Sequence, residues 1–197
     1  AYQVLGGRKS PVSVSYRTGE SHYGFSVGDY DRSLPLVIDP LLASSYLGGK
    51  GNETAYALGV AGEDIFIAGT AESADFPGTG QGAGRLGDAF VLRVGRDLAA
   101  IKAATFIGGS LTEGVRDMTA DGSAITIVGH NSSFDFPTTP MAAYAGSVVS
   151  GAFITRLDPV TLRMISSTSF HPNLFAVAGG PGDSVFVAGA TADPSFP

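Results

Sequence analysis

The sequence predicts an all-β protein built from repeated four-stranded antiparallel sheets of about 60 residues each. Two sets of residues recur with a spacing of 60 positions: glycines that end a short apolar run, and prolines that end a Phe-Pro pair. They are Gly69, Gly129 and Gly189, and Pro77, Pro137 and Pro197. A fixed period of this length is typical of a repeat architecture.

The composition favours short strands joined by turns. The 197 residues include 28 Gly and 11 Pro, and the Val, Ile, Phe, Tyr and Thr residues stand in short runs between Gly, Asp and Pro clusters. Such runs are typical of strands. The Ala-rich pieces are interrupted by Gly or Pro before they reach two helical turns, so we expect almost no helix.

Charge and cysteine content exclude several classes of protein. The net charge is −6 and no run of Lys or Arg is present, so we expect no nucleic-acid partner. No apolar stretch approaches the ~20 residues of a membrane-spanning helix, and we expect no membrane insertion. The absence of Cys excludes disulfides, thiolate metal sites and Cys nucleophiles.

The first 43 residues do not repeat, and we expect them to form a separate N-terminal β segment. Three strands are predicted within it. Residues 11–16 alternate apolar and polar side chains, residues 23–27 form a second apolar run, and residues 34–40 form a third run bracketed by prolines.

Residues 44–197 divide into two full units, 44–103 and 104–166, and a partial unit, 167–197. The predicted strands are 54–60, 64–70, 88–94 and 98–107 in the first unit, and 115–120, 124–130, 151–157 and 162–169 in the second. Four antiparallel strands in 40 to 60 residues match the size of a propeller blade. The partial unit contains only two strands, so we expect a propeller-like fold with an incomplete ring in this chain.

Several blocks resemble a known family. The blocks Tyr46–Gly49, Ile67–Thr70 with Asp75–Pro77, and Asp88–Val94 are similar to the bacterial β-propeller repeat called SBBP. Residues 25–40 are similar to the end of the domain that often precedes those repeats. The resemblance implies a propeller-like fold in large secreted or cell-surface bacterial proteins, usually without an assigned enzymatic activity. The third unit departs from the pattern, because Phe170-His171-Pro172 replaces its Gly-Gly opening.

No motif indicates a catalytic site. Gly24-Phe25-Ser26-Val27-Gly28 fits the G-x-S-x-G pattern, but neither a helix nor a parallel sheet surrounds it, so we interpret Ser26 as an ordinary strand residue. The three histidines, His22, His130 and His171, lie in unrelated settings, and His130 is expected at a solvent-facing strand end. The Gly-rich stretch 78–84 lacks the Lys-Ser/Thr ending of a phosphate loop.

The recurring residues are interpreted as structural anchors rather than as ligands. Asp75 and Asp135 are expected to accept nearby backbone N–H groups and close a turn, and no calcium-loop spacing is present. The buried rings would be Phe76, Phe136 and Phe196. Each is followed by a proline that ends the segment. We therefore expect no catalytic, cofactor or metal residues.

These observations favour a non-enzymatic extracellular or cell-surface structural or interaction module. The expected partners are other copies of the chain, in a homomeric assembly or filament, or further repeats of a longer chain, because incomplete blades leave open edges. One alternative is a glycan- or ligand-binding propeller module lined by exposed aromatics such as Tyr30, Tyr56 and Tyr144. A polysaccharide hydrolase or lyase is the third candidate.

Overall fold

The structure is a computed structural model that describes residues 1–18, 23–38, 45–76, 87–140, 151–171 and 173–192. Contacts divide the chain into two compact units, Ala1–Ser44 and Ser45–Pro197, and each is described by itself. Across the described residues the secondary structure consists of strands in antiparallel sheets, without a helix. The prediction of an all-β chain is confirmed for this part of the protein.

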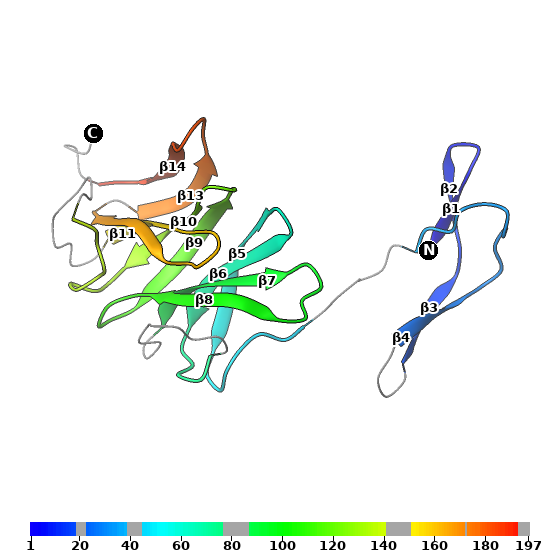
Figure 1. Cartoon of the computed structure of the whole chain (residues 1–197), viewed down its shortest axis with the longest axis horizontal. Coiled ribbons are helices and arrows are strands. Elements are labelled where there is room, and N and C mark those ends of the chain that lie inside the picture. The colour runs from blue at the N-terminus through cyan, green and yellow to red at the C-terminus, as the bar shows by residue number, and fades with distance from the viewer. Residues whose placement is uncertain (19–22, 39–44, 77–86, 141–150, 172, 193–197) are drawn as a thin grey trace. The chain divides into compact units, whose positions relative to one another are not determined.

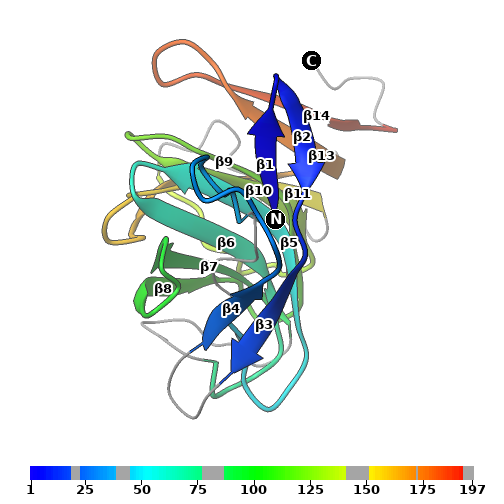
Figure 2. The ribbon, with the colours of Figure 1, turned by 90° about the vertical axis from the view of Figure 1, so that its right-hand side faces the viewer.

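The first unit contains two hairpins (Figure 2). Strands β1 (Tyr2–Leu5) and β2 (Arg8–Pro11) pair with each other, as do β3 (Val14–Thr18) and β4 (Tyr23–Val27). Gly6 and Gly7 connect the first pair with φ values of 54° and 80°. Positive φ at both central residues is the geometry of a two-residue hairpin turn, which glycine adopts without steric cost.

The strand predicted over residues 34–40 is wrong for the part that the structure describes. Only an isolated bridge forms there, between Tyr2 and Val37. The side chain of Gln3 explains why, because its Nε2 donates to the carbonyls of Asp31 (2.7 Å) and Leu34 (3.2 Å). Its Oε1 also accepts the Asp31 N–H at 2.9 Å, so this segment is held as a loop by one buried amide.

The second unit contains two four-stranded sheets and a hairpin (Figure 1). Sheet 1 has the order β5 (Glu53–Ala61), β6 (Asp64–Ala71), β7 (Asp88–Gly95), β8 (Ile101–Ile107). Sheet 2 follows the same order with β9 (Glu113–Ala120), β10 (Ile125–Asn131), β11 (Gly151–Leu157) and β12 (Met164–Phe170). Hairpin 3 pairs β13 (Asn173–Gly179) with β14 (Val185–Ala190).

The fourth strand of each sheet begins later than the sequence predicts. Leu98 and Leu162 have φ values of 54° and 57°, which belong to turns and not to strands. The N–H of Leu98 donates to the Gly95 carbonyl at 2.9 Å, and that of Leu162 donates to the Asp158 carbonyl, also at 2.9 Å. Strand pairing therefore starts only at Ile101 and Met164.

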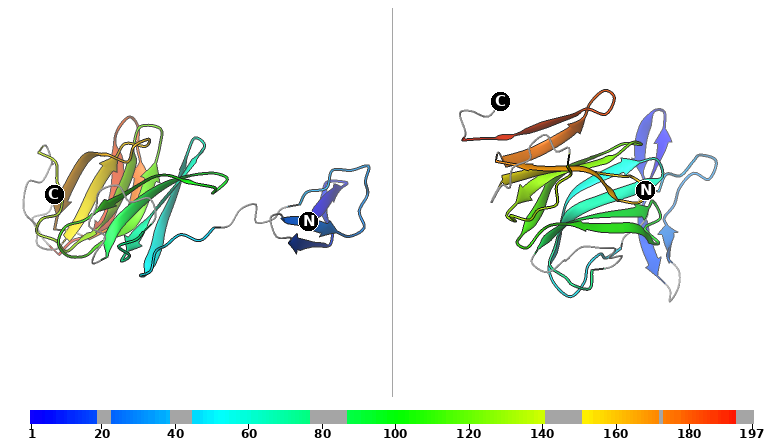
Figure 3. Two further views of the ribbon diagram at one scale, coloured as in Figure 1. Left: turned by 60° about the horizontal axis from the view of Figure 1, so that its bottom comes forward. Right: turned by 60° about the vertical axis from the view of Figure 1, so that its left-hand side comes forward.

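Sheet 1, sheet 2 and hairpin 3 follow one another as layers (Figure 3). We call the face that each layer turns toward the next one its forward face, and the opposite face its rear face. The forward face of sheet 1, with Phe66 and Ala68, packs on the rear face of sheet 2, with Ile125 and Ile127. The forward face of sheet 2 packs in turn on the rear face of hairpin 3. Sheet 2 is therefore covered on both faces.

Two recurring phenylalanines are buried: Phe136 lies in the core between sheets 1 and 2, and Phe76 lies in a separate cluster on sheet 1. The Phe76 ring stands 4.8 Å from that of Phe90 and 5.6 Å from that of Phe106. The Phe136 ring stacks on that of Phe153 at 5.0 Å. Both Phe76 and Phe136 are buried, whereas Phe196 lies outside the described residues.

We predict that Phe76→Ala and Phe136→Ala each lower the free energy of unfolding by roughly 3–5 kcal/mol, because each removes a buried ring from a packed cluster. Phe134→Ala is the matched control, since Phe134 lies two positions from Phe136 and is exposed. Urea denaturation of the three variants measures the change. Equal midpoints for Phe136→Ala and Phe134→Ala would contradict the prediction.

Candidate functional site

The loop that enters each repeat is held by side chains instead of strand pairing. In the second repeat we call residues 108–111 the Gly-Gly loop, and three of its N–H groups donate to side chains. Gly109 N donates to Glu113 Oε2 (2.9 Å), Ser110 N to Asp135 Oδ1 (2.8 Å) and Leu111 N to Ser133 Oγ (2.8 Å). Backbone N–H groups that lose water need such acceptors, and an irregular loop has no ladder to supply them.

The first repeat makes the same three bonds with the equivalent residues. The donors are Gly49 N (3.0 Å), Lys50 N (2.9 Å) and Gly51 N (2.6 Å), and the acceptors are Glu53 Oε2, Asp75 Oδ1 and Ser73 Oγ. Asp75 and Asp135 thus accept backbone N–H groups 25 residues upstream, and not those of a local turn. Their recurrence is explained by loop closure.

The second glycine of each Gly-Gly pair is required by this closure. A Cβ at Gly49 would lie 2.5 Å from both Asp75 Oδ1 and Ser73 Cβ, and at Gly109 it would lie 2.4 Å from Asp135 Oδ1. Real Cβ atoms do not approach other atoms so closely. The glycine therefore lets the loop backbone reach its acceptors.

The glycines spaced 60 residues apart also mark close approach. A Cβ at Gly69, Gly129 or Gly189 would lie about 2 Å from a carbonyl oxygen of the neighbouring first strand, where each layer has a β-bulge. In the two full sheets an aromatic ring of the third strand, Phe90 or Phe153, lies over the glycine. Bulge, glycine and ring form one recurring unit.

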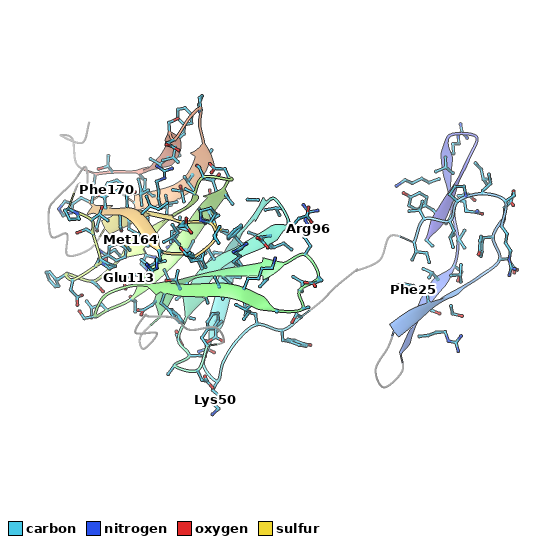
Figure 4. All side chains as sticks on the ribbon, in the orientation of Figure 1. Phe25, Lys50, Arg96, Glu113, Met164 and Phe170 are labelled. Carbon is cyan, nitrogen blue, oxygen red and sulfur yellow. The ribbon has the colours of Figure 1, made fainter. Side chains whose placement is uncertain are left out.

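Two carboxylates meet at the junction of sheets 1 and 2. Asp88 begins β7 and is 2% exposed, and Glu113 begins β9 and is 0% exposed (Glu113 is labelled in Figure 4). Both approach Gly108, because a Cβ there would lie 2.7 Å from Glu113 Oε2 and 2.8 Å from Asp88 Oδ1. The N–H of Glu113 donates to the Gly87 carbonyl at 2.9 Å, which fixes the two sheets together at this point.

Burial, with the nearby negative charge of Glu113, raises the pKa of Asp88 to about 6. The charged form of a carboxylate is disfavoured when water is removed and when a second carboxylate lies close by. Glu113 differs from Asp88 in that its oxygens accept the Gly109 and Ser132 N–H groups (2.9 and 3.4 Å). Asp88 therefore takes up its proton near pH 6.

His130 lies close to this pair and is not the solvent-facing residue that the sequence suggested. It is half-buried on β10 opposite Gly114, and its imidazole fills the space over that glycine. Its Nδ1 is buried without a hydrogen-bond partner. Burial and the positive charge of Arg116 both lower the pKa of His130, so the neutral ring is favoured.

Other residues considered from the sequence have structural roles, belong to different units or lie outside the described residues. Ser26 is an exposed residue of β4 opposite Ser15, and Asp31 accepts the Ser33 N–H and hydroxyl in a turn. Tyr30 and Tyr56 belong to different units. Outside the described residues lie His22, the stretch 78–84, Tyr144, Pro77 and Pro197.

The described part of the chain offers no group of three His, Asp or Glu side chains arranged to hold a metal ion. It also contains no helix able to cross a membrane. Asn131-Ser132-Ser133 fits the N-glycosylation pattern Asn-x-Ser/Thr. Asn131 is buried, its Nδ2 donates to Ser169 Oγ and its Oδ1 accepts the Ser133 N–H, so this amide is not accessible to a glycosylating enzyme. The chemistry of the described residues is therefore mostly that of hydrogen bonds that hold the backbone.

Sequence reasoning missed Gln3 and the Asp88–Glu113 pair. One signal was available, since Glu53 and Glu113 share the 60-residue spacing of the glycines. Asp88 carried no such signal, because Gly151 begins the equivalent third strand of sheet 2. Its partner lies 25 positions away and in a different sheet, so only the fold brings the two together.

We predict that Asp88→Asn stabilises the protein at pH 7 to 8, by on the order of 2 kcal/mol. The folded-state pKa of Asp88 is raised to about 6, from an ordinary value of 3.8. The folded protein thus favours the protonated form of Asp88. The resulting stabilisation is fully present below pH 3.8 and is lost as the pH rises through 6. The variant stays neutral throughout, so its advantage should vanish toward pH 4.

The measurement is the urea midpoint of the variant and the wild type from pH 4 to 8. Comparing the two cancels the opposite effect of Asp31, Asp64 and Asp135, whose hydrogen bonds lower their pKa values. Glu63→Gln is the control, because the Glu63 side chain is mostly exposed. A stability difference independent of pH would show that folding leaves the pKa of Asp88 at its ordinary value, and would contradict the prediction.

Comparison with known protein families matches the first unit. A family model described as a domain of unknown function, DUF7948, matches residues 1–41. No curated protein matches the chain. The match covers a minor part of the 197 residues, and its description carries no activity.

Proposed function

We propose that this chain is a non-enzymatic structural or interaction module built from propeller-type blades and placed at the cell surface or outside the cell. The observation that supports it most is the duplicated closure of the Gly-Gly loop by Glu, Ser and Asp. The recurring polar side chains accept hydrogen bonds from the backbone, which leaves few of their oxygens free to act on a substrate. A structural role accounts for their recurrence.

The arrangement of first strands supports the propeller part of the proposal. Strand β5 contacts β9, and β9 contacts β13, so the first strands of successive repeats neighbour one another. Radially repeated four-stranded sheets with adjacent first strands are the design of a propeller. The resemblance of residues 44–197 to the SBBP repeat supports the extracellular location, and we propose no cofactor.

The strongest argument for an enzyme would be the Asp88–Glu113 pair, since glycoside hydrolases use two carboxylates. The pair is sealed from solvent, at 2% and 0% exposure, and Glu113 is occupied by backbone N–H groups. A polymeric substrate cannot reach such a pair without separating the sheets.

We therefore predict that the purified chain releases no reducing ends from a panel of neutral, acidic and amino polysaccharides. Asp88→Asn and Glu113→Gln serve as matched variants. Hydrolysis by the wild type that either variant abolishes would overturn the non-enzymatic proposal. Hydrolysis that survives in both variants would exclude the Asp88–Glu113 pair as its source.

A second candidate function, glycan binding, is favoured by the residues at the three β-bulges. Tyr56, Arg116 and Phe175 are the extra residues of β5, β9 and β13, and all three are exposed. The strands that carry them are neighbours. Aromatic rings with a guanidinium on one row form a surface suited to stacking on sugar rings.

If this candidate is right, an array of bacterial and host glycans detects binding by the wild type that falls at least about tenfold in Tyr56→Ala and Phe175→Ala. Tyr46→Ala is the control, because Tyr46 is an exposed aromatic outside the bulges. Equal loss in all three variants, or no binding by the wild type, would reject glycan binding at this row.

A further inference from the structure

At the two ends of the layered unit, part of the outer face is exposed where the equivalent part is buried in the middle. At one rear-face position Met118 of β9 is 6% exposed and Val177 of β13 is 8% exposed, since each packs on the preceding layer. Met118 pairs with Ile127 of β10, and Val177 pairs with Val187 of β14. Leu58 of β5 occupies the same position, opposite Ile67, and is 65% exposed.

The forward faces show the reverse order. Phe66 of β6 is 1% exposed and Thr126 of β10 is 2% exposed, because each is covered by the layer that follows. Phe186 of β14 holds the equivalent position and is 63% exposed. Val60 on the rear face of sheet 1 is exposed as well, as is Ala188 on the forward face of hairpin 3. Each end of the second unit thus exposes apolar side chains, on β5 at the rear face of sheet 1 and on β14 at the forward face of hairpin 3. The rear face of sheet 1 is covered over β7, where Leu92 is 0% exposed.

We infer that the forward face of hairpin 3 binds the rear face of sheet 1 in a second copy of this chain. This contact would continue the two internal ones, sheet 1 on sheet 2 and sheet 2 on hairpin 3, with the same register positions. The inference rests on the proposed function and names its partner and its surfaces.

The polar contacts between layers agree with a head-to-tail direction. Arg93 of sheet 1 donates through Nη1 to the Val160 carbonyl of the next layer at 2.8 Å, and Val177 N donates to Asp117 Oδ2 of the preceding layer at 2.8 Å. The two contacts use different residues, so the forward and rear faces of a layer carry different polar groups. The two faces differ, so the association is heterologous and forms a ring if it closes and a filament if it does not.

The test is sedimentation velocity of the full chain over a concentration series, with Leu58→Asp and Phe186→Asp. Both positions are exposed in the single chain, so each variant should keep its far-ultraviolet spectrum and urea midpoint. We expect the wild type to form concentration-dependent oligomers and each variant alone to be a monomer. Ile165→Asp, an exposed position on β12, is the control that should assemble like the wild type.

Mixing the two variants gives the decisive result. Leu58→Asp retains a forward face on hairpin 3, and Phe186→Asp retains a rear face on sheet 1, so an equal mixture should form a dimer and nothing larger. The double variant should not assemble with itself. A mixture that stays monomeric would overturn the head-to-tail contact, and so would assembly that persists in either single variant.

A monomeric wild type would also overturn the inference. That outcome would leave the proposed function standing, because the polysaccharide assay tests it separately. Conversely, hydrolysis lost in Asp88→Asn would remove the proposed function even if the oligomers form.

Discussion

A sheet that is apolar on both faces is stable only between two neighbours, and the second unit depends on this constraint. Sheet 2 meets it within the chain, with Ile125 and Ile127 against sheet 1 and Val128 against hairpin 3. Burial of apolar area on two faces contributes roughly 25 cal/mol per Å² and is the main favourable term in such a stack. Each layer therefore needs the next, as in other repeat proteins.

Hydrogen bonds from the Gly-Gly loop to polar side chains complement this apolar stacking. The Gly-Gly loop enters each sheet where no strand can pair with it, so its N–H groups would be left without partners. Glu, Ser and Asp side chains accept them in both repeats, and the second glycine permits the approach. The bonds to Ser73 and Ser133 are partly buried, so loss of either hydroxyl would leave a donor unpaired away from water, which costs more than the bond itself contributes.

The period of the sequence was enough to predict the strands of sheets 1 and 2, because bulge, glycine and aromatic ring recur together. It was not enough to place Asp75 and Asp135, whose partners lie on a loop 25 residues earlier. It also missed Gln3, a single amide that holds the segment after β4 as a loop. Contacts of this kind depend on which distant backbone comes near, and local pattern carries no information about that.

The junctions between layers differ in charge although they share a register. Asp88 and Glu113 meet between sheets 1 and 2, whereas Gly151 and Asn173 begin the corresponding strands between sheet 2 and hairpin 3. When Asp88 is charged, its repulsion with Glu113 weakens the contact between sheets 1 and 2. A junction without charged side chains lacks this repulsion. At the inferred contact between copies, Glu53 would take the place that Glu113 has between sheets 1 and 2. No counterpart of Asp88 would face it, because Asp88 begins a third strand and hairpin 3 has two strands among the described residues. Association there would depend on the apolar faces, and its strength should vary little between pH 5 and pH 8.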